Sequence, residues 1–328
     1  MEDLGIMVYI TDVARATLPD KLWALLRKGR QKGQRIAKNL RRPIDLRSAR
    51  KALLRSDALS KDEKYLLRNV SLRVHPNDLY LPGGGRHYLS IGLTSLRGIN
   101  AALDHAPHSV RTILDLPSGH GRILRFLKVC FPLATICACD IVPEEVEFCR
   151  REFDAEAIIS NQDFAKVSLP GPFDLIWSGS LLTHVDECRA SELLRLYHRN
   201  LAPGGLCVFT MHGSTSAEWL RSRAETYNLT EISRQKVLSE FDNRGYGYAD
   251  YEPGSGYDIS YGISVATRAR IVEIASAAGN WTFSSFFERG WSNHHDVYGF
   301  TKGQTKAPLI VEARSSVPAV SNVWRWVL

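Results

Sequence analysis

The stretch Val110–Leu127, VRTILDLPSGHGRILRFL, decides the fold of this chain. Its first part is rich in β-branched and aliphatic residues and predicts a buried strand that ends at Asp115. The chain then turns through Gly119 and Gly121 and continues with apolar residues at helical spacing. A strand, a glycine turn and a helix in this order open a nucleotide-binding α/β unit. The glycines let backbone N–H groups and the helix N-terminus approach a ligand closely.

The turn departs from the dinucleotide-binding fingerprint G-x-G-x-x-G, since Leu124 stands where the third glycine is expected. Asp115 lies shortly before the first glycine instead. A carboxylate at that position would repel a pyrophosphate, but it can accept a hydrogen bond from an ammonium group. The combination therefore favours a cationic ligand with an amino-acid part, such as S-adenosylmethionine.

The pattern Asp115-x-x-x-Gly119-x-Gly121 resembles motif I of the class I S-adenosylmethionine-dependent methyltransferases. The family often has a further glycine where this chain has Pro117, and proline fixes φ near about −65°. The resemblance spans about Tyr88 to Lys302. It implies an α/β, Rossmann-like fold with a seven-stranded, mostly parallel sheet and helices on both faces. It also implies S-adenosylmethionine as the cofactor and S-adenosylhomocysteine as the product.

A second buried strand, ATICAC over residues 134–139, ends at Asp140. An acid at this strand tip is placed to bind both ribose hydroxyls, and its separation from Gly121 is close to the expected spacing of ~20 residues. The alternative is a plain helix cap. Ile141 would pack on the adenine, and Asp163, after a short third strand, matches the family's adenine-binding position. An ordinary loop role for Asp163 is the alternative.

The fourth predicted strand, FDLIW over residues 173–177, ends at Ser178 and continues as SGSLLTHVD. This run resembles motif IV of the family's small-molecule branch. It differs from the Asn/Asp-Pro-Pro-aromatic box of enzymes that methylate exocyclic base amines. The resemblance thus implies a cofactor site made of Asp115, Leu116, Gly119, Gly121, Asp140, Ile141, Asp163, Phe164 and Ser178.

Four histidines near the predicted ligand edge are candidate general bases: His184, His212, His294 and His295. For His184, a packing role at the start of the next helix is the favoured interpretation, and the general base is the alternative. Adjacent side chains point apart in an extended chain, and no carboxylate stands at a recognised metal-ligand spacing from the His294-His295 pair. The sequence therefore predicts no metal site.

The positive charge is concentrated near the N-terminus. Residues 1–75 contain 18 Lys and Arg against 8 Asp and Glu, whereas the remainder contains 24 against 27, within a total net charge of +7. Helices that pack on the domain or form a homodimer are the favoured interpretation of this basic helical extension. A peripheral membrane surface or nucleic acid is a less favoured partner.

The predicted organisation has three parts: the extension at 1–75, a class I methyltransferase domain at 76–304 and a tail at 305–328 that contains Trp324 and Trp326. An aromatic, glycine-containing insert at about 212–266 suits either a substrate wall or a small satellite core. The six cysteines lie among apolar neighbours and form no C-x-x-C pair, which predicts reduced core thiols. No apolar run of membrane-spanning length and no signal-peptide pattern occurs, so the expected location is cytoplasmic.

These observations predict methyl transfer to an oxygen or nitrogen of a small molecule, such as a sugar, glycan or natural-product intermediate. An RNA or protein methyltransferase that docks through the basic extension is one alternative. A nicotinamide oxidoreductase, against which Leu124 argues, and a non-catalytic module with the same fold are two others.

Overall fold

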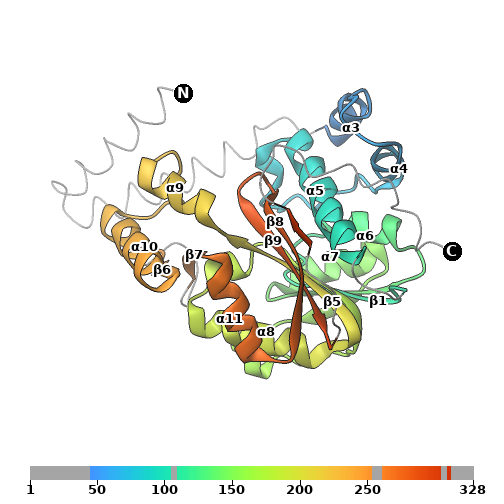
Figure 1. Ribbon diagram of the computed structural model, residues 1–328. Helices are drawn as coiled ribbons and strands as arrows, with labels where there is room; N and C mark the ends of the chain where they lie inside the picture. Colours follow the sequence, from blue (N-terminus) through green and yellow to red (C-terminus); the bar gives the residue numbers. More distant parts are fainter. Residues whose placement is uncertain (1–44, 105–108, 253–260, 304–308, 312–328) are drawn as a thin grey trace, which may run out of the picture. The chain divides into compact units, whose positions relative to one another are not determined.

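The central sheet of the computed structural model has the strand order β3-β2-β1-β4-β5-β9-β8-β10 (Figure 1). Its strands are β1 (Thr112–Asp115), β2 (Thr135–Asp140), β3 (Glu156–Ile159), β4 (Phe173–Ser178), β5 (Leu201–His212), β8 (Trp281–Trp291), β9 (His295–Lys302) and β10 (Leu309–Val311). Within the described part of the sheet, β9 is the strand that runs antiparallel to its neighbours. The expected mostly parallel, seven-stranded sheet is confirmed, and β10 adds an eighth strand at the edge.

The structure describes residues 45–104, 109–252, 261–303 and 309–311. Residues 1–45 and 46–328 are separate units, and the description concerns the second. The predictions for residues 1–44 and for Trp324 and Trp326 lie outside the described residues. Across the described helices, no segment combines the length and the apolar character that crossing a membrane requires.

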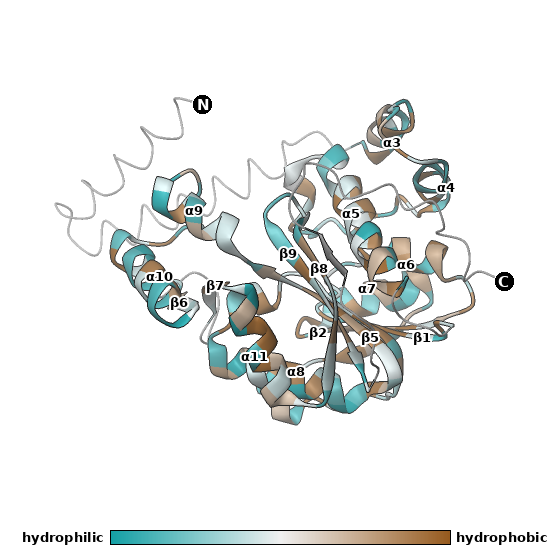
Figure 2. Cartoon of the chain, viewed as in Figure 1, coloured by the Kyte–Doolittle hydropathy of each residue, from teal (hydrophilic) through white to brown (hydrophobic). Residues whose placement is uncertain are grey.

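Helices cover both faces of the sheet. They are α3 (Leu46–Leu54), α4 (Lys61–Asn69), α5 (Gly85–Leu103), α6 (Leu124–Cys130), α7 (Pro143–Phe153), α8 (Glu187–Asn200) and α11 (Arg268–Ala278). Figure 1 shows α5, α6 and α7 on one side and α8 and α11 on the other. The central strands are buried on both faces and therefore carry hydrophobic runs, which appear brown in Figure 2.

Residues 46–75, which belong to the predicted extension, are part of the same unit as the sheet. Helix α4 begins with a capping box, in which the Ser60 hydroxyl accepts from Glu63 N at 3.1 Å and Glu63 Oε2 accepts from Ser60 N at 2.8 Å. Glu63 also forms an ion pair with Arg97 of α5. The compact unit therefore begins at Leu46, before the boundary that charge composition suggested at residue 75.

The insert at 212–266 contains α9 (Ser214–Ser222), α10 (Glu231–Arg244) and a two-stranded antiparallel sheet of β6 (Tyr246–Asp250) and β7 (Gly262–Ala266). It has its own hydrophobic cluster, made of Ala217, Leu220, Val237, Phe241, Ala249, Ile263 and Val265. The interpretation as a satellite core is thereby confirmed. The insert also contributes Tyr261 to the wall of the cavity described below.

Candidate functional site

A cavity of about 330 Å³ lies at the C-terminal ends of β1, β2, β3 and β4. Parallel strands end at a common edge, which is where open α/β sheets bind their ligands. The lining residues include Leu79, Tyr80, Leu116–His120, Arg122, Asp140–Val142, Glu145, Ser160–Gln162, Phe164, Trp177, Gly179–Leu181, Tyr261 and Trp291. The volume falls in the range of small-molecule and cofactor sites.

The glycine turn forms one wall of this cavity. Gly119 and Gly121 have φ angles of +50° and +72°, which lie in the left-handed region that glycine adopts without strain. A Cβ at Gly121 would lie 2.5 Å from the Phe153 ring, whereas one at Gly119 would meet nothing within 4 Å. Gly121 therefore serves close packing against α7, and Gly119 leaves open space beside the cavity. The neighbouring Leu116–Pro117 peptide bond is cis.

Asp140 joins the tip of β2 to the glycine turn. Its Oδ2 accepts from Gly119 N at 2.9 Å and its Oδ1 accepts from Val142 N at 3.3 Å. Burial raises the pKa of this carboxyl group, and the backbone hydrogen bonds partly oppose that rise. Ile141, which follows, lines the cavity with its side chain half exposed. Both residues therefore line the cavity, and their contacts with ribose and adenine stay predictions.

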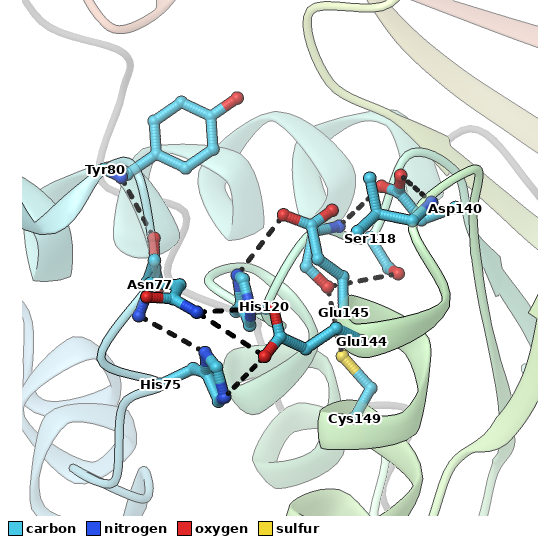
Figure 3. A network of polar contacts seen from close by, with 12 residues as sticks. His75, Asn77, Tyr80, Ser118, His120, Asp140, Glu144, Glu145 and Cys149 are labelled. Carbon is cyan, nitrogen blue, oxygen red and sulfur yellow. Dashed lines mark hydrogen bonds and ion pairs between the residues drawn. The ribbon is translucent and has the colours of Figure 1, made fainter. Parts of the chain in front are cut away.

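Glu145 adds a second acid beside Asp140, as Figure 3 shows. Burial and the neighbouring Asp140 raise its pKa to about 8. The carboxylate of Glu145 also lies 3.3 Å from Nδ1 of His120, whose ring stacks on His75 with centroids 4.5 Å apart. This acid on the first turn of α7 is therefore a hydrogen-bonding group at the cavity that the sequence analysis missed.

Asp115 does not belong to the cavity wall. Its side chain is 1% exposed, and neither carboxylate oxygen has a hydrogen-bond partner within the described structure. Burial, together with the charge of Asp140, raises its pKa well above the usual value and so favours the neutral acid. Because Leu116 forms the wall at this point, the structure does not bring the Asp115 carboxyl group to a ligand in the cavity.

Asp163 and Ser178 also lie off the wall, although Phe164 lines it. The Asp163 side chain is 47% exposed, accepts from Ala165 N at 3.0 Å and pairs with Lys166 at 3.2 Å. Ser178 is fully buried and accepts a hydrogen bond from the Tyr197 hydroxyl at 2.7 Å. Their neighbours Phe164, Trp177 and Gly179 line the wall instead, and in the strand that contains Ser178 successive side chains point to opposite faces.

Arg122 places a cation in the cavity wall. Its guanidinium lies 3.9 Å from the centroid of the Tyr80 ring and 5.9 Å from that of Trp291. Burial lowers its pKa, although the group remains an obligate cation at neutral pH. The sequence analysis missed Arg122. It directly follows the second glycine of the motif, and a basic residue beside a glycine turn is the signal that could have identified it.

The four candidate histidines gather on the side of Trp291 and Tyr261. The centroid of the His212 ring lies 6.5 Å from that of His184 and 4.5 Å from that of His295. Tyr261, which lines the cavity, stacks on His184 at 4.6 Å, and Trp291, which also lines it, contacts His295 at 4.9 Å. The histidines thus form a second layer behind the aromatic wall.

The expectation that His294 and His295 point apart is wrong. Their ring centroids lie 4.3 Å apart, because Ser292 and Asn293 have positive φ angles of +54° and +62° and turn the chain tightly before β9 begins. The extended geometry assumed from the sequence does not exist at this turn.

The arrangement therefore offers an apolar cavity with Asp140 at the tip of β2, Glu145 on the first turn of α7, the half-buried cation Arg122 and imidazoles behind an aromatic wall. Such a cavity suits a ligand that combines a nucleoside with a charged amino-acid part. The hydroxyl groups of a ribose could donate hydrogen bonds to Asp140 and Glu145, and a ligand carboxylate could pair with Arg122.

Residues 113–205 match a family model described as a methyltransferase domain. No curated protein matches the sequence. Among solved structures, an S-adenosylmethionine-dependent methyltransferase from Clostridium acetobutylicum is 13% identical, with 65% of this chain and 92% of that chain covered and a TM-score of 0.46. DesVI from Streptomyces venezuelae is 14% identical, with 70% and 100% covered and a TM-score of 0.47. Human N-acetylserotonin methyltransferase, solved in complex with SAM, is 19% identical, with 70% and 61% covered and a TM-score of 0.41.

Proposed function

We infer that this chain, an S-adenosylmethionine-dependent methyltransferase by the domain it carries at residues 113–205, methylates an oxygen or nitrogen atom of a small molecule. The observation that supports this proposal most strongly is the cavity at the strand ends, where Asp140 is hydrogen-bonded to the glycine turn of the matched domain. We also propose a cytoplasmic location, which the free cysteines of the described residues favour.

The cofactor's three parts find matching groups in the cavity. Asp140 and Glu145 would accept hydrogen bonds from the ribose hydroxyls, and Arg122 would pair with the methionine carboxylate. The apolar side chains of Ile141 and Phe164 would pack on the adenine. When bound, S-adenosylmethionine supplies a sulfonium methyl group that is already activated. The protein's main task is therefore to position the acceptor in line with that methyl group.

His184 is the histidine we propose as the proton acceptor for a hydroxyl nucleophile. Its Nδ1 donates to the Gly262 carbonyl at 2.7 Å, and since a carbonyl oxygen can only accept, the lone pair is on Nε2. That Nε2 lies 3.5 Å from the hydroxyl of Ser180, a residue of the cavity wall. Burial lowers the pKa of His184 and keeps the imidazole neutral, which is the form a general base requires.

Calorimetric titration with S-adenosylmethionine tests the cofactor assignment. The wild-type chain should bind it, and Asp140→Ala should weaken binding by roughly tenfold or more because hydrogen bonds to a charged group contribute about 1.5–3 kcal/mol. Asp163→Ala is the matched control and should leave the affinity unchanged, since that exposed side chain lies off the cavity. Absence of binding to the wild-type chain would refute the proposed function.

A further inference from the structure

Three histidines from two distant parts of the chain lie close together behind Trp291. His212 ends β5, His294 lies in the turn between β8 and β9, and His295 begins β9. One ring nitrogen from each lies within 4.8 Å of the others. We refer to these three residues as the histidine cluster.

Hydrogen bonds determine which nitrogen of each ring in the histidine cluster carries the proton and which carries the lone pair. Nδ1 of His212 donates to the Ser264 carbonyl at 3.1 Å, and Nδ1 of His294 donates to the Ser292 carbonyl at 2.8 Å. Since carbonyl oxygens only accept, the lone pair of both rings is on Nε2. Nδ1 of His295 lies 3.2 Å from the Thr210 hydroxyl oxygen, which can likewise accept a hydrogen bond from it.

This pattern is the one that accompanies metal-binding histidines. A ligating imidazole almost always donates its other ring N–H to a carbonyl, carboxylate or similar oxygen, which fixes the tautomer and the ring direction. Here both carbonyls and the hydroxyl come from the framework of the sheet or from its turns. The rings are therefore held before any ligand arrives.

The surroundings of the histidine cluster favour neutral imidazoles. His212 and His295 are 2% and 4% exposed, and the rings of Tyr227 and Trp219 pack on His212 and His294 at 4.7 and 5.4 Å. Loss of solvent contact in such surroundings disfavours the charged imidazolium form. Neutral imidazole is the form that binds metal ions.

We propose that the histidine cluster binds one divalent transition-metal ion of the zinc class, with a fourth position open to an oxygen or sulfur ligand. Three imidazole nitrogens suit zinc and its first-row neighbours, whereas magnesium and calcium require oxygen ligands. Metal sites with three protein ligands and one open coordination position typically bind a substrate or a water molecule at that position. This proposal goes beyond methyl transfer, because the metal ion would bind in the absence of both S-adenosylmethionine and a methyl acceptor.

Cobalt(II) titration of the chelator-treated full-length chain tests the proposal. Tetrahedral cobalt bound by imidazoles absorbs visible light strongly, so the wild type should develop this band and saturate at one equivalent. His294→Ala removes a ligand at a half-buried turn position and should abolish the stoichiometric band, while circular dichroism verifies that it is folded. Thr210→Val retains all three ligands but removes the hydroxyl beside His295, and should weaken cobalt affinity by about 10–100-fold.

His198→Ala is the matched control, since this histidine lies on α8 beside Trp281 and outside the cluster. It should bind cobalt like the wild type. A wild-type chain without the band, or a band that persists in His294→Ala, would overturn the proposal. Calorimetry with S-adenosylmethionine on the same samples separates the two proposals, because His294→Ala should retain cofactor binding while it loses cobalt.

Discussion

Arg122 illustrates how one side chain determines which ligand a cavity accepts. Its guanidinium lies on the Tyr80 ring inside a largely apolar wall, where a charge is weakly screened. A carboxylate that enters this cavity therefore gains more from the pairing than it would at the surface. S-adenosylmethionine carries such a carboxylate, and 5′-methylthioadenosine is a nucleoside thioether that lacks it.

Arg122→Met should therefore separate these two ligands. Methionine retains an unbranched apolar side chain against Tyr80 but removes the charge. We expect affinity for S-adenosylmethionine to fall roughly tenfold or more, and affinity for 5′-methylthioadenosine to change little. Paired calorimetric titrations measure both. An equal loss for the two ligands would mean that Arg122 shapes the cavity without binding a carboxylate.

Glu145 should make stability depend on pH. Its pKa is raised from 4.5 to about 8, so the folded chain binds this proton more tightly than the unfolded chain. The resulting stabilisation is fully present below pH 4.5 and is lost as the pH rises through about 8. Glu145→Gln removes this dependence, so the variant should gain stability relative to the wild type over that interval.

Urea unfolding at several pH values measures this difference. Glu147→Gln is the matched control on the same helix, because hydrogen bonding to Arg150 lowers the pKa of Glu147. Its stability difference from the wild type should stay constant over the same interval. A constant difference for Glu145→Gln as well would contradict the prediction.

The glycine turn and α7 form one packed element in which the two glycines have different tasks. Gly121 faces the Phe153 ring of α7, whereas Gly119 faces open space beside the cavity. Both have positive φ angles, so any other residue at either position adds backbone strain of about 1–2 kcal/mol. Only a side chain at position 121 also clashes with a neighbour, the Phe153 ring.

Gly121→Ala should therefore destabilise the fold by roughly 2–5 kcal/mol, which sums the backbone strain and the overpacking against Phe153. Gly119→Ala should cost about 1–2 kcal/mol in stability and should weaken S-adenosylmethionine binding by a new methyl group beside the cavity. Thermal unfolding and calorimetry distinguish the two effects. Equal destabilisation by both substitutions would contradict the packing role of Gly121.

At the scale of the whole molecule, the compact unit begins at Leu46. Helices α3 and α4 belong to it, since Glu63 of α4 pairs with Arg97 of α5, and Arg125 of α6 donates to the Ser71 and Arg73 carbonyls at 2.9 Å. Basic composition therefore does not mark the edge of the folded unit.

A chain that starts at Leu46 should fold and bind S-adenosylmethionine with unchanged affinity, because every lining residue of the cavity lies within residues 79–291. A second truncation that starts at Pro76 should be less stable, since it removes α3, α4 and the Glu63–Arg97 pair. Circular dichroism and calorimetry on both truncations test this boundary. Unfolding of the first truncation would place the boundary earlier.

The amino-acid sequence by itself predicted a mostly parallel, Rossmann-like sheet with helices on both faces, and motifs that resemble those of the class I methyltransferases. The reason is local: strand hydrophobicity, glycine turns, helix caps such as Ser60 and the spacing from Gly121 to Asp140 are properties of short segments. Residues 113–205 match a methyltransferase-domain model, in agreement with the motif resemblance. Asp140, Ile141, Gly119 and Phe164 lie at the cavity for the same reason, since strand ends are predictable.

Only the tertiary structure decided which side chains face the ligand and which histidines meet. Asp115 and Ser178 are buried off the wall, because a single-residue shift at a strand end reverses the side-chain direction. Asp163 accepts from Ala165 N in its own loop. The histidine cluster depends on the pairing of β5 with β9 and on two left-handed residues in the β8–β9 turn. Contacts between residues about 80 positions apart carry no local signature, so spacing along the chain cannot reveal them.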